Sequence, residues 1–179
     1  MLSLEIQPRP EIQIVNTVCT ADLKQEVDIT NFNKYEYFSA NLDLYRCGYV
    51  KNKNMIGRVT VFRTGKLIST GTKSIESGFK ELEIAAKLLK KYKLIKSYKL
   101  NPKTQNIVTR INLERRINLE KFARTLPKIM YEPEQFPGLI LRFTGSTVAL
   151  IFASGKIILT GAKSYEDLNS VYFELIHIF

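Results

Sequence analysis

Two short apolar runs near the end of the chain, residues 148–152 and 156–160, have hydrophobic side chains at almost every position. Successive side chains of a strand point to opposite sides, so residues 148, 150 and 152 face one side while Ala149 and Ile151 face the other. An antiparallel sheet normally keeps one face wet, and these runs therefore predict strands with two apolar faces. Helices can cover only one of the two. The second face needs another cover: a second sheet, a dimer partner, or a ligand as broad as a nucleic-acid groove.

A long internal repeat organises the sequence. Residues 62–74, FRTGKLISTGTKS, reappear as residues 152–164, FASGKIILTGAKS, at an offset of 90 residues. The same offset, without a gap, superposes five further pairs: Asn16 on Asn106, Val18 on Val108, Leu23 on Leu113, Phe32 on Phe122, and Gly48 on Gly138. Self-similarity of this kind marks duplicated structural units. The sequence therefore predicts two structurally equivalent halves.

Each half is predicted to contain the same elements in the same order. An opening strand, at residues 12–19 or 105–111, leads into a short helix, for which Asp28 and Asn118 are the expected N-caps. Short strands follow and include a hairpin, whose turn lies at residues 64–66 in the first half and 154–156 in the second.

A helix is predicted to close each half. Ser74 and Ser164 are its expected N-caps, and Glu76 or Glu166 lies in the first turn. The first closing helix should continue to about Tyr92, because apolar residues follow helical spacing at Phe79, Leu82, Ala86 and Leu89. These elements give an N-terminal tail over residues 1–11, a first repeat over 12–92, a basic connector over 93–103, and a second repeat over 104–179.

Composition narrows the chemistry. The 179 residues carry a formal net charge of +10, which favours polyanionic partners; an ordinary protein from a lysine-rich proteome is the alternative. Cys19, Cys47 and the single histidine, His177, match no zinc-site spacing and no catalytic triad, so we expect no metal and two free, buried or half-buried thiols. No run approaches the roughly 20 apolar residues of a membrane helix. The first residues lack the pattern of a secretory signal, which predicts an intracellular protein.

Three segments of the second half carry a resemblance to a known family. They are QNIV at residues 105–108, YEPEQFPGLILR at 131–142, and LIFASGKIILTGAKS at 150–164. In this order they resemble the repeat of the TATA-box-binding protein family, and the EPEQFPG stretch resembles archaeal members. The match covers nearly the whole chain. The resemblance implies an α+β fold in which one curved antiparallel sheet forms a saddle, with four helices on the convex side and DNA on the concave side.

The resemblance implies that the protein bends DNA. Members of the family push two pairs of phenylalanines between base steps of the minor groove. The corresponding residues here are Phe136 and Phe152 in the second half and Phe62 in the first. We call the side chains that enter a base step wedges. At the offset of 90 residues, the fourth wedge position is Arg46, and Tyr45 and Tyr49, which flank it, are alternatives.

The resemblance also implies contacts that read A·T pairs. Asn16 and Asn106 correspond to the central asparagines of the family, whose amides donate to thymine O2 and adenine N3, and Thr70 and Thr160 lie beside them. An apolar floor packs against sugars and base edges and leaves the N2 amino group of guanine without a partner. The floor residues are Val18, Val108, Ile68, Ile158 and Leu150. The first-half counterpart of Leu150 is the more polar Thr60.

Phosphate and protein contacts complete the implied site. The basic residues assigned to phosphates are Arg142, Lys66, Lys73, Lys156 and Lys163. The counterpart of Arg142 at the offset of 90 is Asn52, with Lys51 and Lys53 beside it. In the second-half loop, Glu132, Glu134 and Gln135 match the residues that family members offer to transcription factor B.

The implied function is that of a general transcription initiation factor. It would bind an AT-rich TATA-box element of double-stranded DNA, bend it, and recruit transcription factor B and, indirectly, RNA polymerase, without catalysis or a cofactor. We expect no membrane association, a cytoplasmic, nucleoid-associated location in an archaeal cell (nuclear in a eukaryote), and a homodimer through the concave face as an option for the DNA-free protein.

Three alternatives stay open from the sequence. A divergent paralogue with altered promoter preference, acting as an activator or a repressor, fits the altered first half. DNA-repair glycosylases and nucleases use similar repeats, but they add a catalytic domain for which this length has no room. A protein-only interaction module would cover the second apolar face with another protein.

Overall fold

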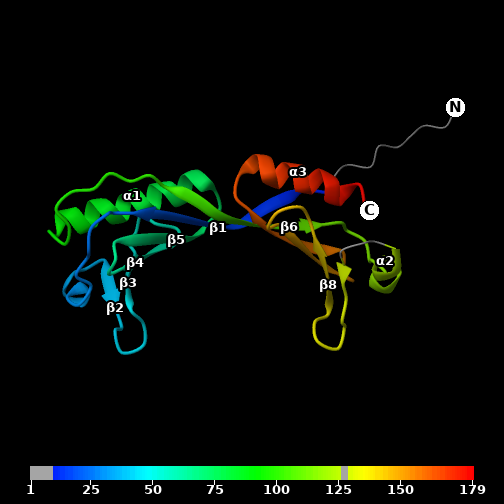
Figure 1. Cartoon of the computed structure of the whole chain (residues 1–179), viewed down its shortest axis with the longest axis horizontal. Helices are drawn as coiled ribbons and strands as arrows, with labels where there is room; N and C mark the ends of the chain where they lie inside the picture. The colour runs from blue at the N-terminus through cyan, green and yellow to red at the C-terminus, as the bar shows by residue number, and fades with distance from the viewer. Residues whose placement is uncertain (1–9, 126–128) are drawn as a thin grey trace. The chain divides into compact units, whose positions relative to one another are not determined.

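The computed structural model describes residues 10–125 and 129–179, which form ten strands, three α-helices and one 3-10 helix. The strands are β1 Ile12–Asp22, β2 Phe38–Ala40, β3 Cys47–Val50, β4 Arg58–Phe62, β5 Lys66–Thr72, β6 Lys103–Asn112, β7 Ile129–Met130, β8 Gly138–Arg142, β9 Val148–Phe152 and β10 Lys156–Ala162. The helices are η1 Phe32–Lys34, α1 Ile75–Lys91, α2 Leu119–Thr125 and α3 Tyr165–Ile176. Figure 1 shows the order of these elements along the chain.

The strands belong to one sheet with the order β2-β3-β4-β5-β1-β6-β10-β9-β8-β7. The pairings within each half are antiparallel. The described residues divide into two compact units, one of residues 14–107 and one of residues 108–179 together with residues 10–13. Both long strands, β1 and β6, therefore contribute residues to each unit. The α+β fold class with a single antiparallel sheet is confirmed.

The closing helices begin where the sequence predicts. The hydroxyl oxygen of Ser74 accepts a hydrogen bond from the backbone N–H of Ser77 at 3.1 Å, and that of Ser164 accepts one from Asp167 at 3.1 Å. Such N-caps satisfy a backbone donor that a helix end leaves without a partner. The first closing helix ends at Lys91, with Tyr92 as its C-cap, so the predicted extent is confirmed.

The short helix after the opening strand forms only in the second half. Asn118 caps α2 as predicted, because its side-chain oxygen accepts from the backbone N–H of Lys121 at 2.9 Å. The N-cap prediction for Asp28 is wrong: its carboxylate accepts from the N–H of Thr30, two residues on, at 2.9 Å, and only the 3-10 helix η1 follows. The segment 29–35, ITNFNKY, consists mostly of poor helix formers, whereas LEKFAR in α2 consists mostly of good ones.

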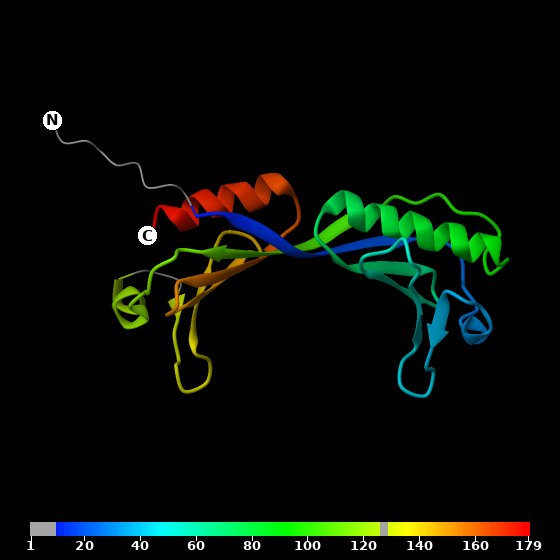
Figure 2. The same ribbon diagram turned by 180° about the vertical axis from the view of Figure 1, so that it is seen from behind.

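The strands of both halves alternate between two kinds of environment. In β9, Ala149 and Ile151 are buried while residues 148, 150 and 152 are only half-buried. The buried side chains lie under helices, since α1 packs on β4 and β5, and α3 packs on β10 (Figures 1 and 2). We call the opposite side of each half the open face. The prediction of strands with two apolar faces, one of them covered by helices, is confirmed.

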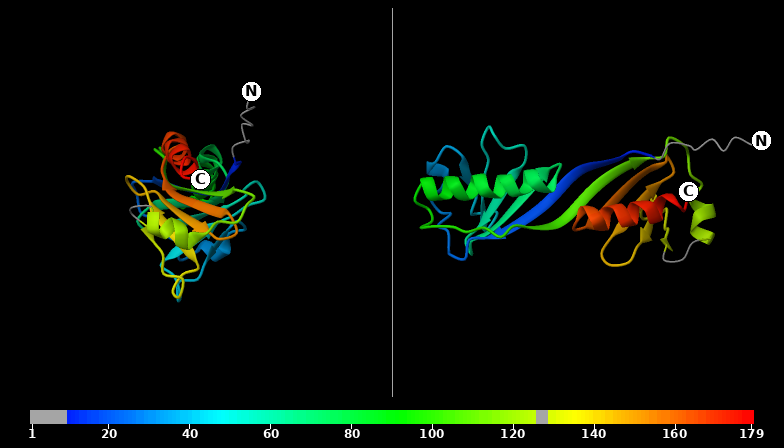
Figure 3. Two further views of the ribbon diagram at one scale, coloured as in Figure 1. Left: turned by 90° about the vertical axis from the view of Figure 1, so that its right-hand side faces the viewer. Right: turned by 90° about the horizontal axis from the view of Figure 1, so that it is seen from above.

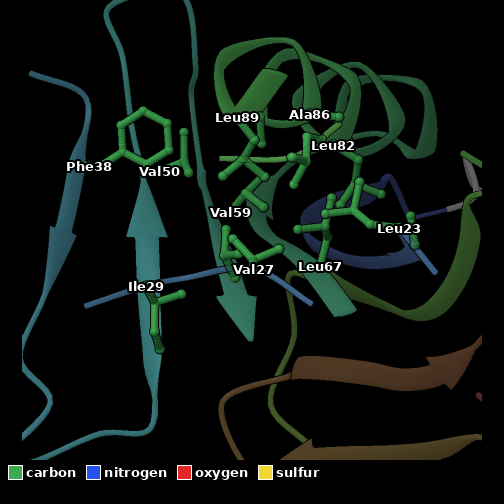
Figure 4. Packing of buried hydrophobic residues seen from close by; sticks show 14 of the residues in the cluster. Leu23, Val27, Ile29, Phe38, Val50, Val59, Leu67, Leu82, Ala86 and Leu89 are labelled. Carbon is green, nitrogen blue, oxygen red and sulfur yellow. The ribbon is translucent and has the colours of Figure 1, made fainter. Parts of the chain in front are cut away.

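The core of the first unit lies between α1 and the strands. Leu82, Ala86 and Leu89 of α1 are fully buried against Val59 and Leu67 (Figure 4). Seen from above, in the right panel of Figure 3, α1 and α3 each run across the strands of their own half. No helix among the described residues is long and apolar enough to cross a membrane.

The basic connector between the repeats packs onto the first unit. Ile95 is buried in its core, and Tyr98 donates to the carboxylate of Glu83 at 2.9 Å. The side-chain amide of Gln25 forms two hydrogen bonds with the connector. Its NH₂ group donates to the carbonyl of Ser97, and its oxygen accepts from the N–H of Lys96 at 3.0 Å. The lysines of this segment are therefore held on an ordered backbone.

Candidate nucleic-acid interface

The open face of the second half is apolar. Ile140 of β8, Leu150 of β9 and Ile158 of β10 lie opposite one another in the strand register and form a half-buried row. Val148 and Thr160 form the neighbouring row. Five predicted contact residues of this half thus occupy one face together: Leu150, Ile158, Thr160, Phe136 and Phe152.

Two of the predicted wedges, Phe136 and Phe152, already form a pair. Their ring centroids lie 5.8 Å apart, with an angle of 64° between the ring planes. Gly138 makes this pairing feasible, because a Cβ at this position would lie 2.7 Å from the ring of Phe136 and 3.1 Å from that of Phe152. The two rings therefore form one half-exposed apolar group at the loop end of β8.

The open face of the first half has the same backbone but more polar side chains. Tyr49, Thr60 and Ile68 lie opposite one another and form the first row. Arg58 pairs with Thr70, which pairs with Val18 in turn. The guanidinium of Arg58 stacks over the ring of Tyr49, 4.7 Å from its centroid, as a cation–π contact.

The strand register corrects the sequence alignment of the two halves. Phe62 and Phe152 are equivalent at the offset of 90, yet Phe62 pairs with Cys47 and Phe152 pairs with Gly138. Cys47 and Gly138 are therefore equivalent, at an offset of 91. The loops before these strands agree: the N–H of Tyr45 donates to the carbonyl of Asn41, and that of Phe136 to Glu132, both at 2.9 Å. The gap-free alignment is wrong over β2, β3 and the loop between them.

The corrected register changes the fourth wedge position. Tyr45, and not Arg46, is the structural counterpart of Phe136. Its side chain is exposed (56%), and among the described residues it forms no ring pair with Phe62 like that of Phe136 with Phe152. Cys47 provides a reason, since it places a side chain where Gly138 leaves room for two rings.

The pairing of Gly48 with Gly138 in the sequence alignment is also wrong. A shift of one residue moves a strand side chain to the opposite face of the sheet. Gly138 lies on the open face, under two rings, whereas Gly48 lies on the covered face, where a Cβ would meet the ring of Phe32 at 2.3 Å. The two glycines are therefore required for different steric reasons. Because they coincide at the offset of 90, the sequence alignment does not show that the strands are equivalent at an offset of 91.

The counterpart of Arg142 changes in the same way, from Asn52 to Lys51. The ammonium group of Lys51 donates to three carbonyls of the loop that follows it: Met55 at 3.0 Å, Ile56 at 2.6 Å, and Gly57. Lys51 therefore organises this loop, and its charge is committed within the chain. Arg142 itself is exposed.

Asn16 and Asn106 occupy matching positions on β1 and β6. The side-chain oxygen of Asn16 accepts from the N–H of Gly71 at 2.8 Å. Gly71 has a φ of 92° and is skipped where the register of β1 and β5 shifts, between Thr17 and Val18. This contact uses the acceptor end of the amide, so the NH₂ group is the end that can donate to a ligand.

Basic side chains gather beside Phe62 in the first half. An open hollow of about 600 Å³ is lined by Phe62 and Ile68 together with four lysines: Lys24, Lys66, Lys99 and Lys103. Asp22 also lines the hollow and forms an ion pair with Lys24 at 3.0 Å. Lys99 and Lys103 come from the connector, whose positive charge is visible in the sequence although its position beside Phe62 is not. The remaining lysines assigned to phosphates, Lys73, Lys156 and Lys163, are exposed.

The loop before β8 exposes the side chains that resemble a partner site. Glu132, Glu134 and Gln135 are all exposed, and the carbonyl of Glu132 accepts from the N–H groups of Gln135 and Phe136, both at 2.9 Å. The first-half loop makes the same turn but exposes Leu42 and Leu44 (42% and 71%). Both cysteines are free and buried, as predicted, and burial is the main cause that raises the pKa of Cys19.

Duplicated halves, an antiparallel sheet with one helix-covered and one open face, and basic side chains around that open face define a class of two-repeat nucleic-acid-binding proteins. Residues 11–92 and 101–179 match the family described as transcription factor TFIID, or TATA-binding protein. The chain belongs to this family of DNA-binding transcription factors, whose members bind TATA DNA.

Relatives and a solved structure agree with this assignment. The chain is 35% identical to the TATA-box-binding protein of Cenarchaeum symbiosum, over 96% of this chain and 95% of the relative. It is 36% identical to that of Pyrodictium occultum, over 96% and 89%. The structure of Methanococcus jannaschii TBP superposes with a TM-score of 0.81 at 30% identity, and the match covers 94% of this chain and 97% of that one.

Proposed function

We propose that this protein is a general transcription initiation factor that binds an AT-rich promoter element of double-stranded DNA through the minor groove. One observation carries the proposal: the open face of the second half has a row of half-buried apolar side chains, Ile140, Leu150 and Ile158, that needs a cover. The first half supports it with Asn16 and with a hollow lined by lysines. Asn16 and Asn106 would donate to thymine O2 and adenine N3. The apolar floor, with Leu150 and Ile158, would leave the guanine N2 amino group unpaired and so disfavour G·C pairs.

Bending of the DNA is part of the proposal. Apolar side chains that enter the minor groove unstack base steps and kink the duplex. Phe136 and Phe152, half-exposed and already paired, would form the wedge of the second half. Phe62 and Tyr45 would form that of the first. Lys66, Lys156 and Arg142 would hold phosphates beside the wedges.

Recruitment of transcription factor B is assigned to the second-half loop. Glu132, Glu134 and Gln135 are exposed on a turn fixed by two backbone hydrogen bonds. In the corrected register the first-half loop has Asn41, Asp43 and Leu44 in their place, so one carboxylate is lost and the amide of Gln135 is replaced by an apolar side chain. A docking site on one half alone would set the direction of transcription for a protein built from two similar halves. RNA polymerase would follow through transcription factor B. The polar open face of the first half favours, as a second candidate, a paralogue with altered promoter preference.

A salt titration tests DNA binding. We expect an AT-rich duplex to bind the protein in a mobility-shift assay and the affinity to fall steeply as salt rises, because bound phosphates release counterions. Replacement of the four lysines by glutamine at positions 66, 73, 156 and 163 should reduce the slope of log K against log salt by about 3 to 4. If no duplex binds, with or without transcription factor B, the proposed function is wrong.

The corrected register predicts which residue of the first-half loop meets DNA. Tyr45→Phe removes a hydroxyl from the wedge and should raise affinity by a few-fold, since base–aromatic stacking is worth roughly 1–3 kcal/mol and a buried hydroxyl opposes it. Arg46→Phe should leave the bend almost unchanged. Fluorescence energy transfer across the duplex measures the bend for both variants. If Arg46→Phe increases the bend and Tyr45→Phe does not, the wedge position is residue 46 and the corrected assignment is wrong.

A further inference from the structure

The two open faces differ in polarity at matching positions of their outer strands. In the corrected register, Ile140, Val148 and Leu150 of the second half have as counterparts Tyr49, Arg58 and Thr60. All three apolar side chains of the second half are thus replaced by groups that can form hydrogen bonds. They lie next to Ile68 and Thr70, which are matched by Ile158 and Thr160 in the other half.

The polar side chains of the first half form one connected group. Tyr49 and Thr60 are directly opposite on neighbouring strands, and the guanidinium of Arg58 lies 4.7 Å from the centroid of the Tyr49 ring. The thiol of Cys47 donates to the hydroxyl of Tyr49 at 3.7 Å. Cys47 and Arg58 therefore both hold the side chain of Tyr49, and Tyr49 and Thr60 place two hydroxyl-bearing side chains on the open face.

This difference has a direct consequence for base readout. In the minor groove, a G·C pair differs from an A·T pair by the N2 amino donor of guanine. Against Ile140 and Leu150 this donor loses its water and finds no acceptor, which is costly. Against Thr60 and Tyr49 it meets hydroxyl oxygens that can accept a hydrogen bond.

We infer that the two halves read half-sites of different stringency: the second half requires A·T pairs, whereas the polar group Tyr49–Arg58–Thr60 lets the first half accept a G·C pair. Given a duplex with G·C in one half-site only, the protein binds in the orientation that places this G·C under the first half. The polar group thus determines both the sequence tolerance and the direction of binding. The inference rests on the proposed function.

Affinity measurements with three duplexes test the tolerance. One has A·T pairs throughout, the second has one G·C pair in one half-site, and the third has a G·C pair at the matching position of both. We expect less than a threefold loss for the second duplex, because the protein can choose its orientation, and about a tenfold or greater loss for the third, as for one unfavourable pair. A tenfold loss already on the second duplex would overturn the inference.

Directed cleavage tests the orientation. An iron chelate attached to Pro133→Cys, on the exposed loop beside Phe136, marks the flank under the second half; the native cysteines are buried. On the second duplex we expect cleavage of the flank on the A·T side, and on the uniform duplex cleavage of both flanks. Equal cleavage of both flanks on the second duplex contradicts the inference, while absence of binding to the uniform duplex contradicts the proposed function instead.

Reciprocal variants assign the effect to the polar group. The triple variant Tyr49→Ile, Arg58→Val, Thr60→Leu should lose tolerance, so that one G·C pair costs about tenfold in either orientation. The matched variant Ile140→Tyr, Val148→Arg, Leu150→Thr should tolerate G·C in both half-sites. Thr60→Leu alone serves if a triple variant fails to fold. Each readout is the ratio of the affinities for the uniform and the G·C-containing duplex. A weaker affinity for all DNA, caused by the loss of the Arg58 charge, therefore cancels. If this ratio is unchanged in both Thr60→Leu and the triple variant, the assignment is wrong.

Discussion

The double variant Phe136→Ala, Phe152→Ala should bind an AT-rich duplex roughly 100-fold more weakly than the native chain and should bend it much less. Contact between one aromatic ring and a base is worth about 1–3 kcal/mol, and about 1.4 kcal/mol corresponds to a factor of ten in affinity. The two rings are half-exposed and already paired at 5.8 Å, so the proposed wedge should need little rearrangement when DNA binds. A mobility-shift titration measures the affinity, and energy transfer across the duplex measures the bend.

The matched control is the double variant Tyr45→Ala, Phe62→Ala in the first half. We expect a smaller loss, roughly tenfold, because Tyr45 carries a hydroxyl and Cys47 keeps the two rings from closing over the strand as they do over Gly138. Equal losses in the two double variants would show that the wedges are equivalent despite their side chains. Thermal melting of each variant separates a binding defect from unfolding.

Phe32→Ala should lower the free energy of unfolding by about 3–5 kcal/mol, the usual cost of removing a fully buried phenylalanine. Phe32 is 0% exposed, and its ring packs edge-on against Phe38 with centroids 5.0 Å apart. It also fills the space over Gly48. Urea unfolding measures the loss; the control Phe122→Ala, at the half-buried counterpart, should cost less.

A double-mutant cycle with Gly48→Ala tests the steric explanation. In the native chain the added methyl group would lie 2.3 Å from the ring of Phe32, and overpacking of this kind costs typically about 1–3 kcal/mol. In the Phe32→Ala background the same methyl group enters a cavity and should cost little or even stabilise. A Gly48→Ala cost that is the same in both backgrounds would rule out the ring as the reason for this glycine.

Much of the local structure follows from the sequence alone. The two N-caps Ser74 and Ser164, the extent of α1 and the apolar character of both strand faces depend on contacts or periodicities within a few residues, and all are as predicted. The failed helix after Asp28 is local too, since the low helix propensity of residues 29–35 is visible in the sequence.

The residue-by-residue equivalence of the two halves could not be predicted in this way, because strand register depends on residues that are far apart in the chain. Identical glycines at positions 48 and 138 favoured a gap-free alignment, although one faces the covered side and the other the open side. Only the pairing of Cys47 with Phe62 and of Gly138 with Phe152 reveals the shift. The same pairing moves the fourth wedge to Tyr45 and the counterpart of Arg142 to Lys51.

The sequence by itself determined that the chain is duplicated, which family it resembles, and which side chains of the second half gather on one face, because long motifs and short-range periodicity carry that information. Only the tertiary structure showed which polar and basic side chains of the first half lie together on its surface. Tyr49 and Arg58 are nine residues apart in the chain and come together only across neighbouring strands, and Lys99 of the connector reaches the hollow beside Phe62 only through packing. Such contacts arise from strand pairing and burial, which no local pattern records.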